Sequence, residues 1–173
     1  MKFLKDIFVG NFPIVQRFGE NPAIYNPMGL AGHNGIDFAT PIGTIIMPGC
    51  KGEIIAVSDD GKKGYGKSVV IKTSSGGFIY ELRWAHLSAF GPSQRVGDSV
   101  DVDDTLGATG NTGFCVHNGH LVTDAEREQG LGAHLHFQIR EMDEHGQILN
   151  WSQWPDNARG FKGAIDPIDF FDL

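Results

Sequence analysis

Histidines and one aspartate occur in three short blocks that could support metal-dependent chemistry. The blocks are Gly-His-Asn-Gly-Ile-Asp at 32–37, Trp-Ala-His-Leu-Ser at 84–88 and Ala-His-Leu-His-Phe at 133–137. In a strand, successive side chains point to opposite faces, so His134 and His136 should share one face and Leu135 the other. A divalent metal ion can use two imidazoles on one face, whereas a buried polar pair without a partner is costly.

The first block can complete such a site. His33 and Asp37 lie four residues apart, so an extended or gently bent segment could aim both to one side. Zinc takes His and carboxylate ligands tetrahedrally, and a catalytic zinc site keeps three protein ligands and one water molecule. His33, Asp37 and one histidine of the His134/His136 pair would fill three positions. The spare histidine would then lie beside the water, where a general base is needed.

Outside these blocks the sequence is typical of short strands separated by turns. Gly supplies 24 of the 173 residues, roughly twice the usual share, which favours many turns. Runs rich in Ile, Val, Thr and Tyr predict strands in 43–48, 52–58, 68–73, 78–87, 99–110, 134–141 and 146–150. The one expected helix runs from Thr123 to Gln129, because Thr123 and Glu126 form a capping-box pattern and Gly130 follows.

These patterns predict one all-β domain over residues 1–173. Residues 1–31 should form an ordered lead-in loop with one short strand, since Asn21-Pro22 and Asn26-Pro27 disfavour helix. The core motifs should occupy 32–141, with an insertion at 114–131. The tail, 142–173, should pack its two phenylalanines against the core.

Charge and composition exclude several partners. A net charge of −7 disfavours binding to nucleic acid or anionic lipid through the overall electrostatic field of the protein.

No apolar run is long enough for membrane insertion, and Lys5 and Asp6 interrupt the N-terminal run that a signal peptide would need. The sequence therefore predicts a soluble chain without Sec-type export. Cys50 and Cys115 favour free thiols in a reducing compartment, although a single bridge stays open.

Taken in order, the motifs resemble the lysostaphin-like, or LytM-type, zinc endopeptidases of bacterial cell walls. The matching segments are GHNGIDFATPIGT, YELRWAHLS, VGDSVDVDDTLGATGNTG and GAHLHFQIRE, and they span about residues 32–141. The order of several blocks makes the likeness far more specific than any single motif. It implies a compact antiparallel β-sheet or sandwich domain, duplicated hybrid motif-like, with a groove over one Zn²⁺ per chain.

The resemblance also implies roles for individual residues. His33 and Asp37 match the first two zinc ligands, and His136 matches the third. His134 matches the catalytic histidine, and His86 matches a second one that polarises the attacking water or stabilises the oxyanion. Which of His134 and His86 is the dominant base stays open. The implied substrate is a peptide stem or cross-bridge of peptidoglycan.

The sequence departs from the family in two ways. The insertion separates the Gly-x-Thr-Gly loop from the His-Leu-His strand, and could form a wall of the groove. It carries Cys115, His117 and His120, a spacing that could hold a second metal but more often marks polar surface. The missing signal peptide favours a phage-encoded enzyme, with a phage particle as a partner.

Tyr25 is similar to a substrate-contacting tyrosine of some relatives. A tyrosine packed in a loop fits the sequence equally well, so Tyr25 is not part of the predicted site.

Three other functions compete with this one. A catalytically dead, wall-binding regulator would generally have lost metal ligands, whereas every ligand position is filled here. A virion structural protein with a stabilising zinc would normally close all four positions with protein ligands. A zinc peptidase for another substrate stays open, because specificity is carried by loops.

Overall fold

The structure, a computed structural model, describes residues 2–92, 94–149 and 160–171. The strands are β1 (Ile14–Gln16), β2 (Ile36–Phe38), β3 (Ile45–Ile46), β4 (Gly52–Asp59), β5 (Lys67–Ser75), β6 (Phe78–Phe90), β7 (Ser99–Val100), β8 (Gly107–Thr109), β9 (Val116–His117), β10 (His120–Leu121), β11 (Leu135–Met142) and β12 (Ala164–Ile165). The helical segments are α1 (Pro22–Tyr25), η1 (Asn26–Met28), α2 (Asp124–Glu128) and η2 (Pro167–Phe170).

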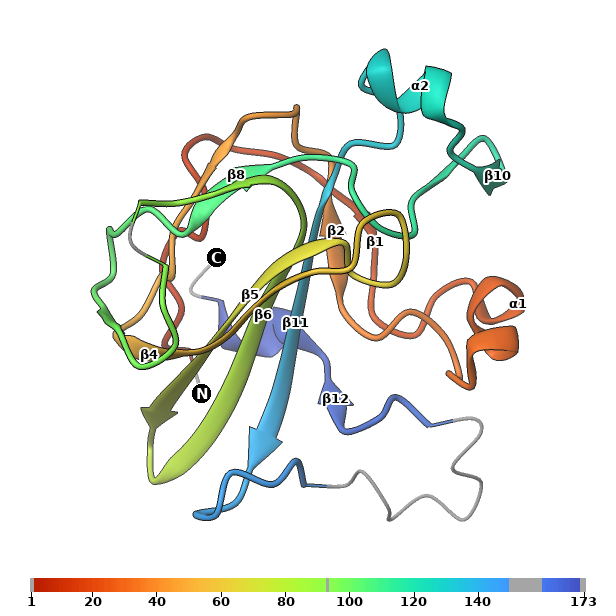
Figure 1. The fold of residues 1–173 in the computed structure, drawn as a ribbon. Coiled ribbons are helices and arrows are strands. Elements are labelled where there is room, and N and C mark those ends of the chain that lie inside the picture. The colour runs from red at the N-terminus through yellow and green to blue at the C-terminus, as the bar shows by residue number, and fades with distance from the viewer. Residues whose placement is uncertain (1, 93, 150–159, 172–173) are drawn as a thin grey trace.

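The main sheet is antiparallel, which confirms the predicted fold class. Its strands follow the order β1-β2-β11-β6-β5-β4-β7, with β12 paired to β11 and β8 paired to both β3 and β6. The long strands β5, β6 and β11 lie side by side at its centre (Figure 1). A separate hairpin of β9 and β10 belongs to the insertion.

The hydrophobic core lies on one face of these central strands. Trp84 of β6 pairs in register with Phe137 of β11, and both side chains are fully buried. Leu135 and Ile139 alternate with His136 along β11 and are also fully buried in the core. Side chains alternate along a strand, so His136 is directed to the opposite face.

The short helices show where local sequence decides structure. Helix α2 begins at the predicted capping box: the Thr123 side chain accepts from the Glu126 backbone, and the Glu126 side chain accepts from the Thr123 backbone. The structure adds α1 and η1 in the lead-in segment. Pro22 and Pro27 lie in the first turns of these two elements, where the missing N–H costs no hydrogen bond.

The ends of the described chain contact the core. Leu4 bridges to Phe171, and Leu4, Phe170 and Phe171 are buried. The run predicted as a strand at 146–150 forms only one isolated bridge, from Ile148 to Met142, among its described residues. Residues 150–159 and 172–173 of the predicted tail lie outside the described residues.

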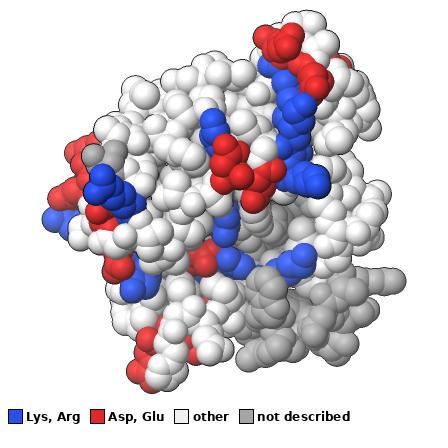
Figure 2. Space-filling view, viewed as in Figure 1, with Lys and Arg blue, Asp and Glu red and all other residues white. Residues whose placement is uncertain are grey.

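No helix in the described ranges is both long and apolar enough to cross a bilayer. On the face shown in Figure 2, acidic and basic side chains of the described residues lie interspersed among uncharged surface.

Candidate metal and catalytic site

Two neighbouring strands bring together three of the predicted site residues. His33 lies just before β2, Asp37 is the middle residue of β2, and His136 lies on β11. Antiparallel pairing of β2 with β11 places Asp37 directly opposite His136. Cross-strand neighbours have closely spaced side chains on the same face, so sheet register creates this cluster.

The three side chains form a small triangle of ligand atoms. His33 Nε2 lies 3.1 Å from Asp37 Oδ1 and 2.9 Å from His136 Nδ1, and His136 Nδ1 lies 3.0 Å from Asp37 Oδ1. All three residues are buried. Tetrahedral zinc with bonds of about 2.0–2.1 Å needs ligand atoms about 3.3 Å apart, so a slight opening of the triangle suits this ion.

Hydrogen bonding supports a cation at the centre of the triangle. His33 Nδ1 lies 3.2 Å from the Arg17 carbonyl oxygen, which accepts a hydrogen bond from it. This tautomer, assigned from the hydrogen bond, leaves a lone pair on Nε2 facing the Asp37 carboxylate. In this tautomer the two electron-rich atoms would repel one another, and a divalent cation between them would be attracted to both. The donor set therefore fits zinc.

Gly35 allows the close approach of the His136 ring. A Cβ built on Gly35 would lie 2.7 Å from His136 Cε1 and would clash with the Phe137 carbonyl oxygen. Only a residue without a side chain fits between β11 and the loop at this point.

Gly35→Ala is therefore expected to destabilise the protein by about 1–3 kcal/mol and to weaken metal binding, since the His136 ring must move. Chemical denaturation and metal titration would measure the two effects. Gly43→Ala is the control, because nothing lies near its Cβ and its positive φ should cost only about 1 kcal/mol. Equal losses in both variants, with metal binding unchanged, would contradict this role of Gly35.

The other two predicted histidines lie beside the triangle. The His86 and His134 ring centroids are 4.6 Å apart, and His134 Nε2 is 3.8 Å from Asp37 Oδ2. His86 Nδ1 lies 2.8 Å from the Thr112 carbonyl oxygen, and His134 Nδ1 lies 2.9 Å from that of Gly132. In the tautomers assigned from these two contacts, each ring donates through Nδ1 and has its lone pair on Nε2. All five predicted site residues thus lie together.

An unusual backbone conformation directs His86 into the site. His86 has φ of +61°, which is uncommon for a residue other than glycine. Ordinary alternation would place it on the core face with Trp84, two residues earlier. The left-handed conformation instead leaves His86 on the face of its neighbour Ala85, which pairs with His136. Such strain is often found at functional sites, and no sequence pattern predicts it.

Burial and contacts between the site residues shift the pKa values of His86, His136 and Asp37. Burial lowers the pKa of His86 well below its usual range, and His134 and His136 lower it further. Burial also lowers the pKa of His136 to about 4, although Asp37 opposes this. Burial alone would raise the pKa of Asp37, but the surrounding histidines His134, His136 and His33 hold it well below its ordinary value. Neutral histidines and an ionised carboxylate are the forms that bind metal.

The metal-free protein should therefore lose stability in mild acid. The pKa of His136 falls from 6.5 in the unfolded chain to about 4 in the folded one, so the unfolded chain binds more protons between these values. The free energy of unfolding should fall as the pH drops through this window, by about 3 kcal/mol from His136. Urea denaturation in chelator, at neutral pH and near pH 4, measures the drop.

His136→Asn should remove the part of this drop that His136 contributes and leave the part that comes from His86, whereas His145→Asn should keep the whole drop, because His145 is largely exposed. Equal pH dependence in the wild type and His136→Asn would contradict the assignment.

A cavity of about 690 Å³ adjoins the cluster. One side is lined by α1 and η1 residues, including Ile24, Tyr25 and Met28, and another by residues of the insertion, including Phe114 and Leu131. Both segments lie on the same side of the central strands (Figure 1). The insertion thus forms one wall of the cavity.

Two tyrosines outside the predicted site contact the histidines. The Tyr25 ring lies 5.3 Å from that of His33, its hydroxyl donates to Gln16, and burial raises its pKa, which keeps the phenol protonated. The Tyr65 hydroxyl accepts from Asn34 and donates to Gln138, and its ring lies 5.6 Å from that of His136. Tyr65 lies in a glycine-rich turn whose sequence carries no sign of this position.

The insertion does not gather its cysteine and histidines. His120 pairs with Glu126, and His117 contacts Asn118. In the described part of the chain, the groups that could hold a metal include Cys115 but neither of these histidines. Cys115 and Cys50 are both free and buried.

Comparison with known proteins identifies the family. The profile described as "Peptidase family M23" matches residues 31–150, so the chain belongs to that family and carries a peptidase domain.

Individual relatives agree with this assignment. The DD-carboxypeptidase/endopeptidase Mpg of Neisseria meningitidis serogroup B is 34% identical over 119 residues, covering 68% of this chain and 21% of Mpg. A zinc-containing peptidase from Vibrio cholerae superposes with a TM-score of 0.58 at 25% identity, covering 86% of this chain and 39% of that one. The catalytic domain of the antimicrobial peptidase lysostaphin from Staphylococcus simulans has the same fold, with a TM-score of 0.57 at 23% identity and coverage of 92% and 91%. The chain spans about a third or less of the length of the curated relatives it matches.

Proposed function

We propose that this domain is a zinc-dependent endopeptidase that hydrolyses peptide bonds in the stems or cross-bridges of peptidoglycan. The triangle of His33, Asp37 and His136 atoms, beside two histidines with available Nε2 atoms, is the observation that carries the proposal. The carboxypeptidase and endopeptidase activity of Mpg, the antimicrobial peptidase activity of lysostaphin and the zinc of the Vibrio cholerae relative support it. The phage context stays a prediction.

In this proposal His33, Asp37 and His136 hold one zinc ion. The ion would supply Lewis acidity toward a substrate carbonyl and would lower the pKa of a water molecule toward neutrality. The site residues leave it a net charge of about +1, because Asp37 contributes the one negative charge. Because the three ligand residues are buried, few water molecules can compete with them for the ion.

His134 is the better placed general base. Its Nδ1–H is fixed by the Gly132 carbonyl, so its Nε2 can take a proton from the attacking water. Asp37 Oδ2, 3.8 Å from that nitrogen, would stabilise the imidazolium that forms. The protonated ring can then deliver its proton to the leaving amine.

His86 favours a different role. Its lowered pKa keeps the ring neutral, and its Nδ1–H is occupied by the Thr112 carbonyl. A neutral ring in this tautomer accepts a hydrogen bond at Nε2 and cannot donate one there. His86 therefore orients the attacking water in this proposal, and the oxyanion needs another donor.

Digestion of purified peptidoglycan tests the function. We expect the zinc-loaded protein to release new amino termini from at least one wall type, chelator to stop the release, and added zinc to restore it. Mass spectrometry of the fragments identifies the bond. Zinc binding without release from any wall type would overturn the proposal in favour of a wall-binding or structural protein.

A further inference from the structure

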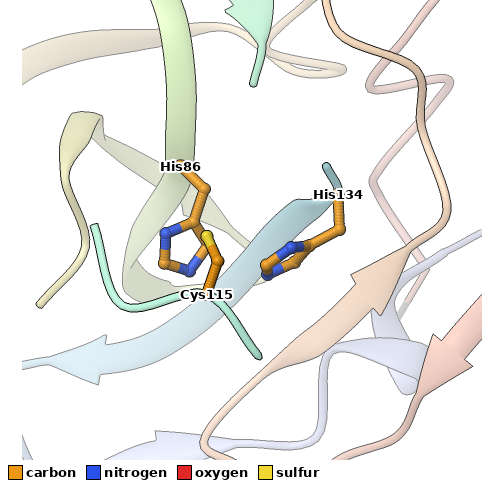
Figure 3. Close-up of side chains that lie close together, drawn as sticks. All are labelled: His86, Cys115 and His134. Atoms are coloured by element: carbon orange, nitrogen blue, oxygen red, sulfur yellow. The ribbon is translucent and has the colours of Figure 1, made fainter. Parts of the chain in front are cut away.

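A second cluster of metal-binding side chains lies next to the first. The ligand atoms of His86, Cys115 and His134 all lie within 4.8 Å of one another. They come from β6, from the insertion and from the residue before β11. Figure 3 shows the Cys115 sulfur beside the His86 ring, with the His134 ring facing the same space.

The Thr112 carbonyl orients two of these three groups. It accepts from His86 Nδ1 at 2.8 Å and from the Cys115 thiol at 3.3 Å. With the Gly132 carbonyl accepting from His134 Nδ1, both imidazoles keep their Nε2 lone pairs for another partner. Cys115 is fully buried and His86 is nearly so, which limits competition from water.

The chemistry of the three groups selects a soft divalent ion. Two imidazoles and one thiolate match the ligands that zinc and cadmium prefer, and exclude hard ions such as Mg²⁺. Binding of the ion would displace the thiol proton to solvent, so one proton leaves per ion bound. Burial raises the pKa of the Cys115 thiol to about 11, and the nearby positive charge of Arg127 opposes this rise and would favour the thiolate.

We propose that His86, Cys115 and His134 form a second site for Zn²⁺ or Cd²⁺, weaker than the first, whose occupation inhibits the peptidase. The site is weaker because a buried thiol must lose its proton before it can bind. It inhibits because the ion occupies both Nε2 lone pairs that the reaction needs. The inhibitory part rests on the proposed function, whereas the binding part depends on the cluster alone.

Metal titration of the full chain tests the binding part. Protein carrying one zinc ion would be titrated with Cd²⁺ while the ultraviolet thiolate-to-cadmium charge-transfer band is followed, and bound metal would be counted after equilibrium dialysis. We expect two ions per wild-type chain with the band present, and one ion without the band in Cys115→Ser. Cys50→Ser is the matched control, because Cys50 is the other buried free cysteine and should leave both results unchanged.

Zinc X-ray absorption provides a readout that needs no variant. The two-zinc wild-type protein should show a zinc–sulfur distance of about 2.3 Å that the one-zinc protein lacks. A single bound ion in the wild type, a band that survives in Cys115→Ser, or no zinc–sulfur scattering in excess zinc would each overturn the proposal.

Wall digestion in excess zinc tests the inhibitory role, and together with the binding data it distinguishes a failure of this proposal from a failure of the proposed function. Excess zinc should inhibit wall digestion by the wild type and Cys50→Ser, and should leave Cys115→Ser near its own one-zinc rate. Wild-type inhibition that is equally strong in Cys115→Ser would contradict the inhibitory role. If no protein digests any wall while the second ion still binds with sulfur ligation, the proposed function fails and the second metal site stands.

Discussion

Replacing His136 with alanine is expected to remove the bound metal and the peptidase activity together. His136 supplies one corner of the ligand triangle, and its removal leaves His33 and Asp37 alone. Losing only the hydrogen-bond partner of a metal ligand costs about 10–100-fold in metal affinity, so losing a ligand should cost more than about 100-fold. Zinc content after dialysis and wall digestion at limiting zinc measure the two losses.

A surface variant keeps this test specific. His145→Ala removes an exposed histidine and should keep both zinc and activity. Circular dichroism should show that His136→Ala stays folded, because His136 faces away from the hydrophobic core. Full zinc content in His136→Ala would contradict the ligand assignment.

His134→Ala is expected to separate activity from metal binding. His134 lies beside the ligand triangle rather than in it, with its nearest Asp37 contact at 3.8 Å. Loss of a general base typically costs about 10²–10⁴-fold in rate, whereas zinc content should stay near one ion per chain. The ratio of kcat to zinc content is the quantity to compare.

The activity of this variant, compared with that of His86→Ala, also shows which of the two histidines is the dominant base. If His134 is the dominant base, His134→Ala should lose more activity than His86→Ala, and its pH–rate profile should lose the acid limb. Loss of zinc in His134→Ala, or a larger defect in His86→Ala, would contradict the assigned roles. Since His86 and His134 also belong to the proposed second metal site, these assays need limiting zinc.

Strand and turn patterns in the sequence predicted the all-β domain and the capped helix α2, and the resemblance to the family implied that the sheet is antiparallel. The hydrophobic runs of the central strands are long enough for period-two alternation to show which side chains share a face. Leu135 and His136 therefore separate to the core and site faces for a reason that is local to β11. The lead-in helix α1 was not predicted, because proline in a first turn is helix-compatible while Asn-Pro steps usually indicate turns.

The order of the motifs was also enough to name the five site residues. The sequence shows their chemical types, imidazole and carboxylate. The match between their motifs and those of the family is a match of sequence, so it needs no knowledge of where the residues lie in space.

Tertiary structure alone decided how these residues meet. Asp37 faces His136 because β2 and β11 pair in one register, although the two residues are 99 positions apart. His86 joins them through a left-handed backbone conformation that breaks the alternation of β6. Cys115 of the insertion lies beside His86 and His134, whereas His117 and His120 of the same segment contact Asn118 and Glu126 instead. Local patterns reflect the preferences of neighbouring residues, whereas register, backbone strain and loop placement depend on packing between distant parts of the chain.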